Sequence, residues 1–118
     1  MADIDEIKRL VDHDQFIISN HARIRIFQRN ITTDMLIEMI TVGEVIEEYP
    51  DDFPCPSVLV LGYSNDHPLH VVLGHCEDHV RIITVYRPDE ESWIEHKKRK
   101  KRDERRSKIR YYRKIEYV

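Results

Sequence analysis

The chain has 118 residues, of which 41% are hydrophobic and 35% are charged, so its length suits one domain with a single modest core. Its N-terminus is charged from Asp3 onward and no apolar run approaches the roughly 20 residues that span a bilayer, which argues against a signal peptide and a membrane helix. The two cysteines, Cys55 and Cys76, lack the paired spacing of a disulfide framework, so we expect reduced thiols and a cytoplasmic protein.

Charge is distributed unevenly along the chain. Residues 1–93 contain 7 Lys and Arg against 18 Asp and Glu, whereas residues 94–118 contain 12 Lys and Arg against 4 Asp and Glu. The net charge of −3 therefore conceals an acidic body joined to a basic tail. Such a tail either binds a polyanion such as RNA, or folds back on its own body or on a sister subunit of a homodimer.

The N-terminal part of the chain has helical patterning. Apolar residues recur at helical spacing within residues 4–11, which predicts a first short amphipathic helix. The apolar run 16–18 is predicted to be an edge strand or an extended lead-in. Ser19 occupies the position of a helix N-cap, and a second helix is predicted over residues 20–29, where Asn30 ends it.

A third helix is predicted from Thr32 or Thr33 to Gly43, and the pattern then changes to that of strands. Short connections between successive strands predict an antiparallel meander. The nearly continuous apolar runs 58–61 and 81–85 indicate central strands that are covered on much of both faces. The four predicted strands span residues 45–49, 57–63, 69–74 and 80–87.

The C-terminal part is predicted to be helical. Trp93 and Ile94 are expected to anchor a last helix to the body, and acidic and basic residues four positions apart support its continuation. We therefore predict an α+β domain over residues 1–94, in which N-terminal helices pack on a four-stranded antiparallel sheet, and a basic helical tail over residues 95–118.

The second predicted helix has the strongest chemical signal. Its polar residues lie on one stripe, formed by His21, Arg25, Gln28 and Arg29, and its apolar stripe, which is expected to dock on the sheet, is formed by Ile24, Phe27 and Ile31. In one interpretation the arginines pair with acids such as Glu47, Glu48 or Asp89, and the histidine is packed. In the other, the guanidinium groups clamp a phosphate and the imidazole exchanges a proton at neutral pH.

The third and fourth strands supply further candidates. Depending on the register, His70 converges with Thr84 and Tyr86, or with Arg87, on one side of the sheet. The alternative is that His70 and Tyr86 are half-buried sheet residues without a chemical role.

Several potential metal ligands lie within thirteen residues, and two pairs have the spacing of zinc ligands. Both groups sit at predicted hairpin turns, where polar residues collect in any case, so we expect no metal site. The residues concerned are His67, His70, His75, Cys76 and His79.

The tail combines cations with interleaved aromatic rings, a composition that favours phosphate contacts and stacking on unpaired bases. The alternative is a solvated helix that keeps the protein soluble or binds a partner. The predicted nucleic-acid-binding residues are Lys97, Lys98, Arg99, Lys100, Lys101, Arg102, Arg105, Arg106, Tyr111 and Tyr112.

Three short motifs follow one another along the chain: Ser19-x-His21-Ala22-x-x-Arg25-x-x-x-Arg29-x-Ile31, Gly43-x-Val45-Ile46-Glu47 and Ile83-Thr84-Val85-Tyr86-x-Pro88. In order and spacing they resemble the bacterial domain-of-unknown-function family numbered 4258, over roughly residues 16–94. The resemblance implies a relationship to RelE/MqsR-like toxins and to the barnase/EndoU/colicin/RelE group of metal-independent ribonucleases. It implies an antiparallel sheet with N-terminal helices packed on it, and mRNA cleavage controlled by a partner antitoxin. The tail after Trp93 is not part of the family pattern.

On this basis we predict a toxin that cleaves single-stranded RNA without a metal ion or other cofactor. The 2′-OH would attack the adjacent phosphate, with His21 or His70 as acid or base. Arg25, Arg29 and Arg87 would stabilise the charged transition state, and Tyr86 would assist proton transfer or stack on a base.

Two other functions are compatible with the sequence. A non-catalytic nucleic-acid binder would need the basic tail but not His21. A protein-interaction module, such as one half of a heterodimer, would bind an acidic partner tightly and RNA weakly.

Overall fold

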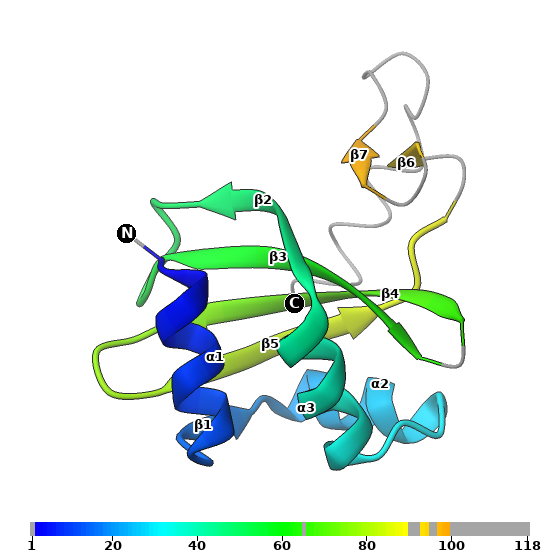
Figure 1. The fold of residues 1–118 in the computed structure, drawn as a ribbon, viewed down its shortest axis with the longest axis horizontal. Coiled ribbons are helices and arrows are strands. Elements are labelled where there is room, and N and C mark those ends of the chain that lie inside the picture. The colour runs from blue at the N-terminus through cyan, green and yellow to red at the C-terminus, as the bar shows by residue number, and fades with distance from the viewer. Residues whose placement is uncertain (1, 65, 90–92, 95–96, 100–118) are drawn as a thin grey trace.

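The protein is built on a five-stranded mixed sheet, seen in a computed structural model that describes residues 2–64, 66–89, 93–94 and 97–99 (Figure 1). The helices are α1 (Ile4–Asp12), α2 (Asn20–Gln28) and α3 (Thr33–Val42). The strands are β1 (Phe16–Ile18), β2 (Glu44–Tyr49), β3 (Ser57–Ser64), β4 (His67–His75), β5 (Val80–Tyr86), β6 (Trp93–Ile94) and β7 (Lys98–Arg99).

The strand order is β1-β5-β4-β3-β2, and β6 and β7 form a separate two-stranded sheet. Strands β2 to β5 form the predicted antiparallel meander. The prediction of a four-stranded, wholly antiparallel sheet is wrong because β1 adds a fifth strand, parallel to β5. The apolar run 16–18 was predicted to be an edge strand or an extended lead-in, and it is an edge strand. A run of three residues contains no information about its partner, so the parallel pairing could not be predicted.

Side-chain caps define where the helices begin. The Ser19 hydroxyl accepts a hydrogen bond from the Ala22 amide at 3.0 Å, and the Thr32 hydroxyl accepts one from the Met35 amide at 3.1 Å. The first confirms the predicted N-cap Ser19, and the second places the start of α3 at the predicted Thr32 or Thr33. Asn30 has φ 55°, a left-handed conformation that asparagine adopts more readily than most residues, and it ends α2 as predicted. None of the helices in the described part of the chain is long and apolar enough to cross a bilayer.

The sheet has a core on each face. The face that α1, α2 and α3 cover contains the larger core, to which the sheet contributes Val58, Val60, Leu69, Val71, Leu73, Val80, Ile82 and Val85. The opposite face contains a smaller cluster of Leu59, Val72, Tyr86 and Trp93. All four residues of the run 58–61 are buried, which confirms that β3 is covered on both faces.

Helix α2 is rotated relative to its predicted orientation. Ile24 and Phe27 are 57% and 83% exposed, so two of the three residues of the expected apolar stripe do not dock on the sheet, and Ala22 and Ile26 are buried instead. The cause lies at the start of the helix, where the Ser19 amide and hydroxyl donate to the Ile82 and Ile83 carbonyl oxygens of β5 at 3.0 and 2.7 Å. This anchor sets the rotation of α2 where β1 ends, and α2 continues along the edge of β5 (Figure 1).

The expectation of reduced thiols is wrong, since Cys55 and Cys76 form a disulfide. Their Cα atoms are 5.2 Å apart although 21 positions separate them in sequence. The register brings them together, because Ser57 of β3 pairs with Gly74 of β4, and the chain continues from this pair to a cysteine on each side.

Reduction of this disulfide is expected to destabilise the protein by about 3 kcal/mol, because the bond closes a loop of intermediate length in the unfolded chain. The melting temperature should fall by roughly 10 °C when a thiol reductant is added. The Cys55→Ser/Cys76→Ser variant should melt at the reduced temperature with or without reductant. An unchanged melting temperature of the wild-type protein under reducing conditions would contradict this account.

The prediction of a helical tail is wrong for the residues of the tail that the structure describes. Trp93–Ile94 and Lys98–Arg99 pair as the β6–β7 hairpin, and Trp93 is buried against the sheet, as its anchoring role predicted. The remaining predicted nucleic-acid-binding residues lie outside the described part of the chain. They are Lys100, Lys101, Arg102, Arg105, Arg106, Tyr111 and Tyr112.

Candidate functional site

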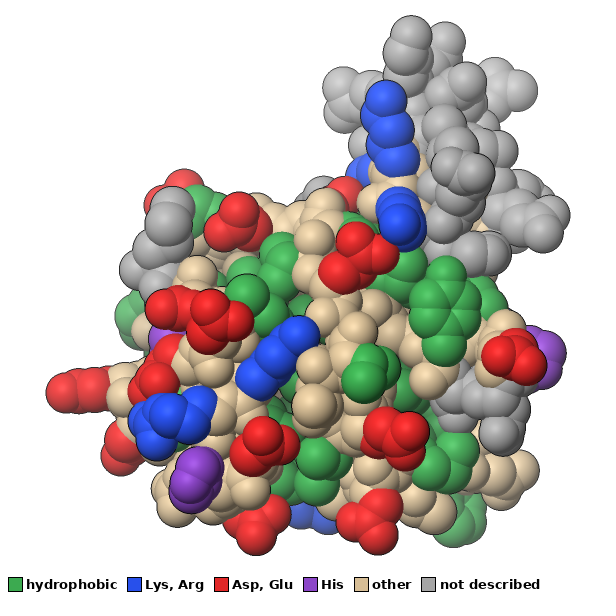
Figure 2. All heavy atoms as spheres, in the orientation of Figure 1, with side chains coloured by type: hydrophobic (Ala, Val, Ile, Leu, Met, Phe, Trp, Pro, Cys, Tyr) green, Lys and Arg blue, Asp and Glu red, His purple; other side chains and the backbone are tan. Residues whose placement is uncertain are grey.

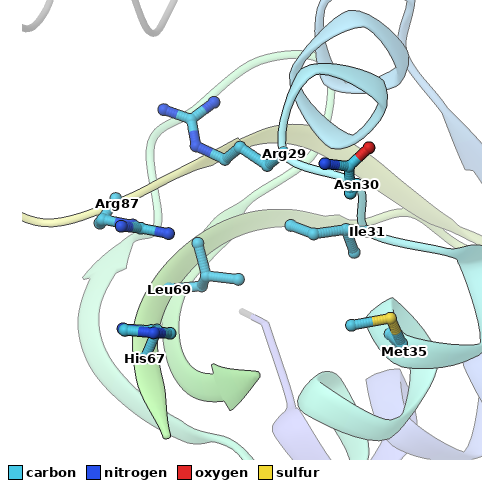
Figure 3. Close-up of a pocket in the computed structure, with 7 residues that line it drawn as sticks. All are labelled: Arg29, Asn30, Ile31, Met35, His67, Leu69 and Arg87. Carbon is cyan, nitrogen blue, oxygen red and sulfur yellow. The ribbon is translucent and has the colours of Figure 1, made fainter. Parts of the chain in front are cut away.

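A pocket of about 190 Å³ opens where the α2–α3 connection meets the ends of β4 and β5 (Figure 3). The connection and the first turns of α3 form one wall, the beginning of β4 forms another, and the residue that follows β5 closes the site. The lining residues are Arg29, Asn30, Ile31, Met35, His67, Leu69 and Arg87.

The α2–α3 connection positions Arg29 and Asn30 at this pocket. The left-handed conformation of Asn30 lets the Ile31 amide donate to the Ile26 carbonyl oxygen at 2.9 Å, which reverses the chain at the end of α2. Ile31 is thereby buried in the core, while Arg29 and Asn30 stay at the solvent boundary.

The strand register positions the other polar groups. His70 pairs with Tyr86, so the next residues outward, Leu69 and Arg87, reach the pocket from the helix-covered face. His67 begins β4 and is exposed, as is Arg87. Figure 3 shows both arginines and the imidazole on one side of the pocket and the thioether of Met35 on the other.

This arrangement is suited to an anionic ligand with an apolar part. Guanidinium groups bind phosphate or carboxylate oxygens through paired hydrogen bonds and keep their charge at any physiological pH. The imidazole of His67 adds a ring whose nitrogens can donate and accept hydrogen bonds. Ile31, Leu69 and Met35 supply an apolar floor.

The structure brings together two of the six predicted catalytic residues, Arg29 and Arg87, at this pocket. His21 and Arg25 are half-buried on α2 and do not line it. His21 precedes Arg29 by eight residues, about 12 Å along a helix axis, which separates its backbone from the pocket. Burial and then the charge of Arg25 lower the pKa of His21 below its ordinary value.

His70 and Tyr86 lie on the opposite face of the sheet and are 0% and 1% exposed. The His70 Nδ1 atom is 3.3 Å from the Tyr86 hydroxyl oxygen, and the imidazole meets the Trp93 ring edge-on at 4.5 Å between centroids. In this conformation no phosphate of an RNA strand can reach either side chain. The alternative described them as half-buried sheet residues; both are sheet residues here, but they are fully buried.

A structural role of His70 predicts a stability defect. His70→Ala should lower the free energy of unfolding by about 2–4 kcal/mol, because it leaves a void beneath Trp93 and removes the partner of the Tyr86 hydroxyl. Chemical denaturation measures the change, and His13→Ala at an exposed position should alter it by less than about 0.5 kcal/mol. Unchanged stability of His70→Ala would contradict a packing role.

Of the potential metal ligands, His70 contacts Tyr86 as described above, and three others also have partners within the protein. The His75 Nδ1 accepts from the Asp3 amide at 3.0 Å, His79 pairs with Asp78 at 2.7 Å, and Cys76 is in the disulfide. Within the described ranges, no three side chains of His, Cys, Asp or Glu come together in a way that could hold a metal ion.

Sequence reasoning missed Asn30 and His67 as pocket residues. Asn30 was recognised as a helix stop, and His67 was considered just as a metal ligand. The sequence signal that could have identified them is their position at the ends of elements: Asn30 follows α2, and His67 begins β4. Their proximity depends on how α2 meets the sheet, which the sequence pattern did not predict.

Comparison with known proteins identifies the family. The family model described as a domain of unknown function, DUF4258, matches residues 18–87, while no curated protein and no solved structure gives a significant match. The matched span contains all seven pocket residues and ends before the β6–β7 hairpin. Because the match covers more than half of the chain, the protein belongs to the DUF4258 family.

Proposed function

We propose that this protein binds single-stranded RNA and that the pocket between Arg29, Arg87 and His67 holds a phosphodiester of the strand. The observation that supports the proposal is the presence of two guanidinium groups from separate elements in one pocket. Paired guanidinium groups are the usual means by which proteins hold phosphate oxygens, and contacts of this kind position a nucleic-acid strand.

The charge distribution also favours a strand over a small anion. Residues 1–93 are strongly acidic and repel a polyanion everywhere except near local cations, whereas the following segment is strongly basic. A single strand carries many phosphates, so both the pocket and this segment would attract it, and its unpaired base or ribose would contact Leu69 and Ile31. A free phosphate would gain the contacts with the pocket cations alone.

Titration of a labelled single-stranded RNA against the full chain tests this function. Binding should weaken as salt is added, with a slope of about −0.7 per contacted phosphate in a plot of log affinity against log salt. Absence of binding at low salt, or binding that does not depend on salt, would contradict the proposal.

The position of His67 favours a second candidate function, cleavage of the bound strand. The 2′-oxygen would attack the phosphorus, the 5′-oxygen would leave, and the products would be a 2′,3′-cyclic phosphate and a 5′-hydroxyl. His67 would take the proton from the 2′-OH, and water would supply the proton that the departing 5′-oxygen takes up. The two arginines would stabilise the negative charge that develops on the phosphate oxygens. His67 replaces His21 and His70 in this proposal because it is the histidine at the pocket.

Such an activity corresponds to the metal-independent RelE-like toxins that the sequence motifs resemble, with an antitoxin as partner. Induced expression should then stop cell growth, and His67→Ala should restore it at equal protein levels. Normal growth on expression of the wild-type chain would argue against the toxin and leave RNA binding as the function.

A further inference from the structure

The smaller core contains a contact between the sheet and the segment that follows it. Trp93, the single tryptophan of the chain, is 2% exposed and packs with Tyr86 and Leu59 on the face opposite the helices. The guanidinium carbon of Arg99 lies 4.4 Å from the centre of the Trp93 ring, so the two strands of the β6–β7 hairpin are joined by a cation–π contact.

Acidic residues of β2 hold the basic residues of this hairpin. Arg99 donates two hydrogen bonds to the Glu47 carboxylate, from Nε at 3.0 Å and from a terminal nitrogen at 2.8 Å. Lys97 pairs with Glu44 at 3.1 Å on the same strand. Figure 2 shows acidic side chains spread over the face that contains α1, α3 and β2, with basic side chains beside them at the β6–β7 hairpin.

The Arg99–Glu47 pair is the strongest part of the contact. Both side chains are largely buried, so water screens their attraction less than it does at the surface. Burial by itself would raise the pKa of Glu47, yet the hydrogen bonds from Arg99 and Tyr49 outweigh it and lower the pKa. The pair is therefore ionised at neutral pH, and its guanidinium is already occupied by a carboxylate.

We propose that the β6–β7 hairpin forms an autoinhibitory contact, in which Glu44 and Glu47 withhold Lys97 and Arg99 from RNA until a polyanion displaces them. The inference rests on the proposed RNA-binding function, because it assigns the hairpin cations to the same ligand as the pocket. The Arg99 side chain is 14% exposed and lies between the Glu47 carboxylate and the Trp93 ring, so a phosphate reaches its guanidinium fully when this contact opens.

The contact has features that permit displacement. The buried indole nitrogen of Trp93 has no hydrogen-bond acceptor among the residues that the structure describes, which reduces the stability gained by burying the ring. Strands of two residues each add few backbone hydrogen bonds. Charge pairing therefore stabilises the closed arrangement together with the packing of Trp93, and a polyanion of high charge density can replace the charge pairs.

Affinity for RNA is the first readout of the test. The Glu44→Gln/Glu47→Gln variant of the full chain should bind single-stranded RNA about tenfold more tightly than the wild type, since it removes the competing carboxylates. The matched control is Glu38→Gln/Glu77→Gln, which removes two exposed glutamates elsewhere and should change affinity less than about threefold. Equal effects of the two variants would overturn the proposal, because net charge alone would then explain them.

Fluorescence of Trp93 is the second readout, and it reports the contact without requiring RNA function. Acrylamide should quench Trp93 weakly in the wild type and strongly in Glu44→Gln/Glu47→Gln, and addition of heparin to the wild type should have the same effect as the substitutions. Protection that persists in the variant and with heparin would overturn the inference. If Trp93 becomes accessible but no variant binds RNA, the hairpin contact opens as inferred, but the RNA-binding function fails and with it the inhibitory role of the contact.

Discussion

Replacing Arg29 and Arg87 together by alanine is expected to weaken binding of single-stranded RNA by at least about 100-fold. The two side chains line one pocket from different elements, and each hydrogen bond to a charged group contributes about 1.5–3 kcal/mol. Fluorescence anisotropy with a labelled oligoribonucleotide at fixed salt measures the loss. The salt dependence should also become shallower, because fewer phosphates are neutralised.

A matched control removes the same two charges away from the pocket. Arg9→Ala/Arg23→Ala should change RNA affinity by less than about threefold, because both side chains are exposed and neither lines the site. The ion pair of Arg9 with Glu6, at 2.6 Å on the surface of α1, contributes little to stability, so this control should fold normally. A similar loss of affinity in both double variants would show that overall charge, rather than the pocket, determines binding.

His67→Ala is expected to reduce the rate of RNA cleavage in the presence of EDTA by a factor of about 100 to 10,000, the usual contribution of a positioned acid or base. RNA affinity should stay within about threefold of the wild type, because the two arginines remain. Single-turnover measurements with saturating protein separate the two quantities. The products should carry 2′,3′-cyclic phosphate ends.

The corresponding control is His13→Ala, which removes an exposed imidazole that lies next to the Arg9 carbonyl oxygen of its own helix at 2.8 Å. It should leave the cleavage rate unchanged. If the wild-type protein yields no cleavage products, the nuclease proposal is wrong and the pocket serves binding alone. If His67→Ala cleaves at the wild-type rate, another group transfers the proton.

Local chemistry made several features of the fold predictable. Ser19 and Thr32 cap helices because a hydroxyl at that position satisfies a free amide, and this requires no knowledge of the tertiary structure. Asn30 ends α2 for a similarly local reason, its tolerance of positive φ. The strands of the meander were predictable because their apolar runs are separated by turn residues.

Features that depend on long-range register were not predictable in the same way. The disulfide between Cys55 and Cys76, the parallel pairing of β1 with β5, and the separation of His70 from Arg87 all follow from which residues face each other across the sheet. Adjacent residues of one strand point to opposite faces of the sheet. A shift of the register by one residue therefore moves a side chain from one face to the other. The candidate site was therefore predicted in part, with Arg29 and Arg87 in the pocket and His70 and Tyr86 behind the sheet.

The tail illustrates a different limit. Its basic residues were considered either as an RNA-binding element or as a segment that folds back on the acidic body. The described residues confirm the second alternative for Lys97 and Arg99, which pair with Glu44 and Glu47. The spacing of charges predicted a helix there, but the burial of Trp93 against Tyr86 and His70 stabilises a hairpin instead. Tertiary packing of one aromatic side chain outweighed a weak local preference.

Mapping of a short oligoribonucleotide on the ¹⁵N-labelled full chain by NMR tests the central claim most directly. The largest shifts of backbone amides should occur at Asn30, Ile31, Leu69 and Arg87, and they should disappear in Arg29→Ala/Arg87→Ala. Shifts confined to other parts of the sheet and helices, or a spectrum that RNA does not change, would contradict the assignment of this pocket as a phosphodiester site.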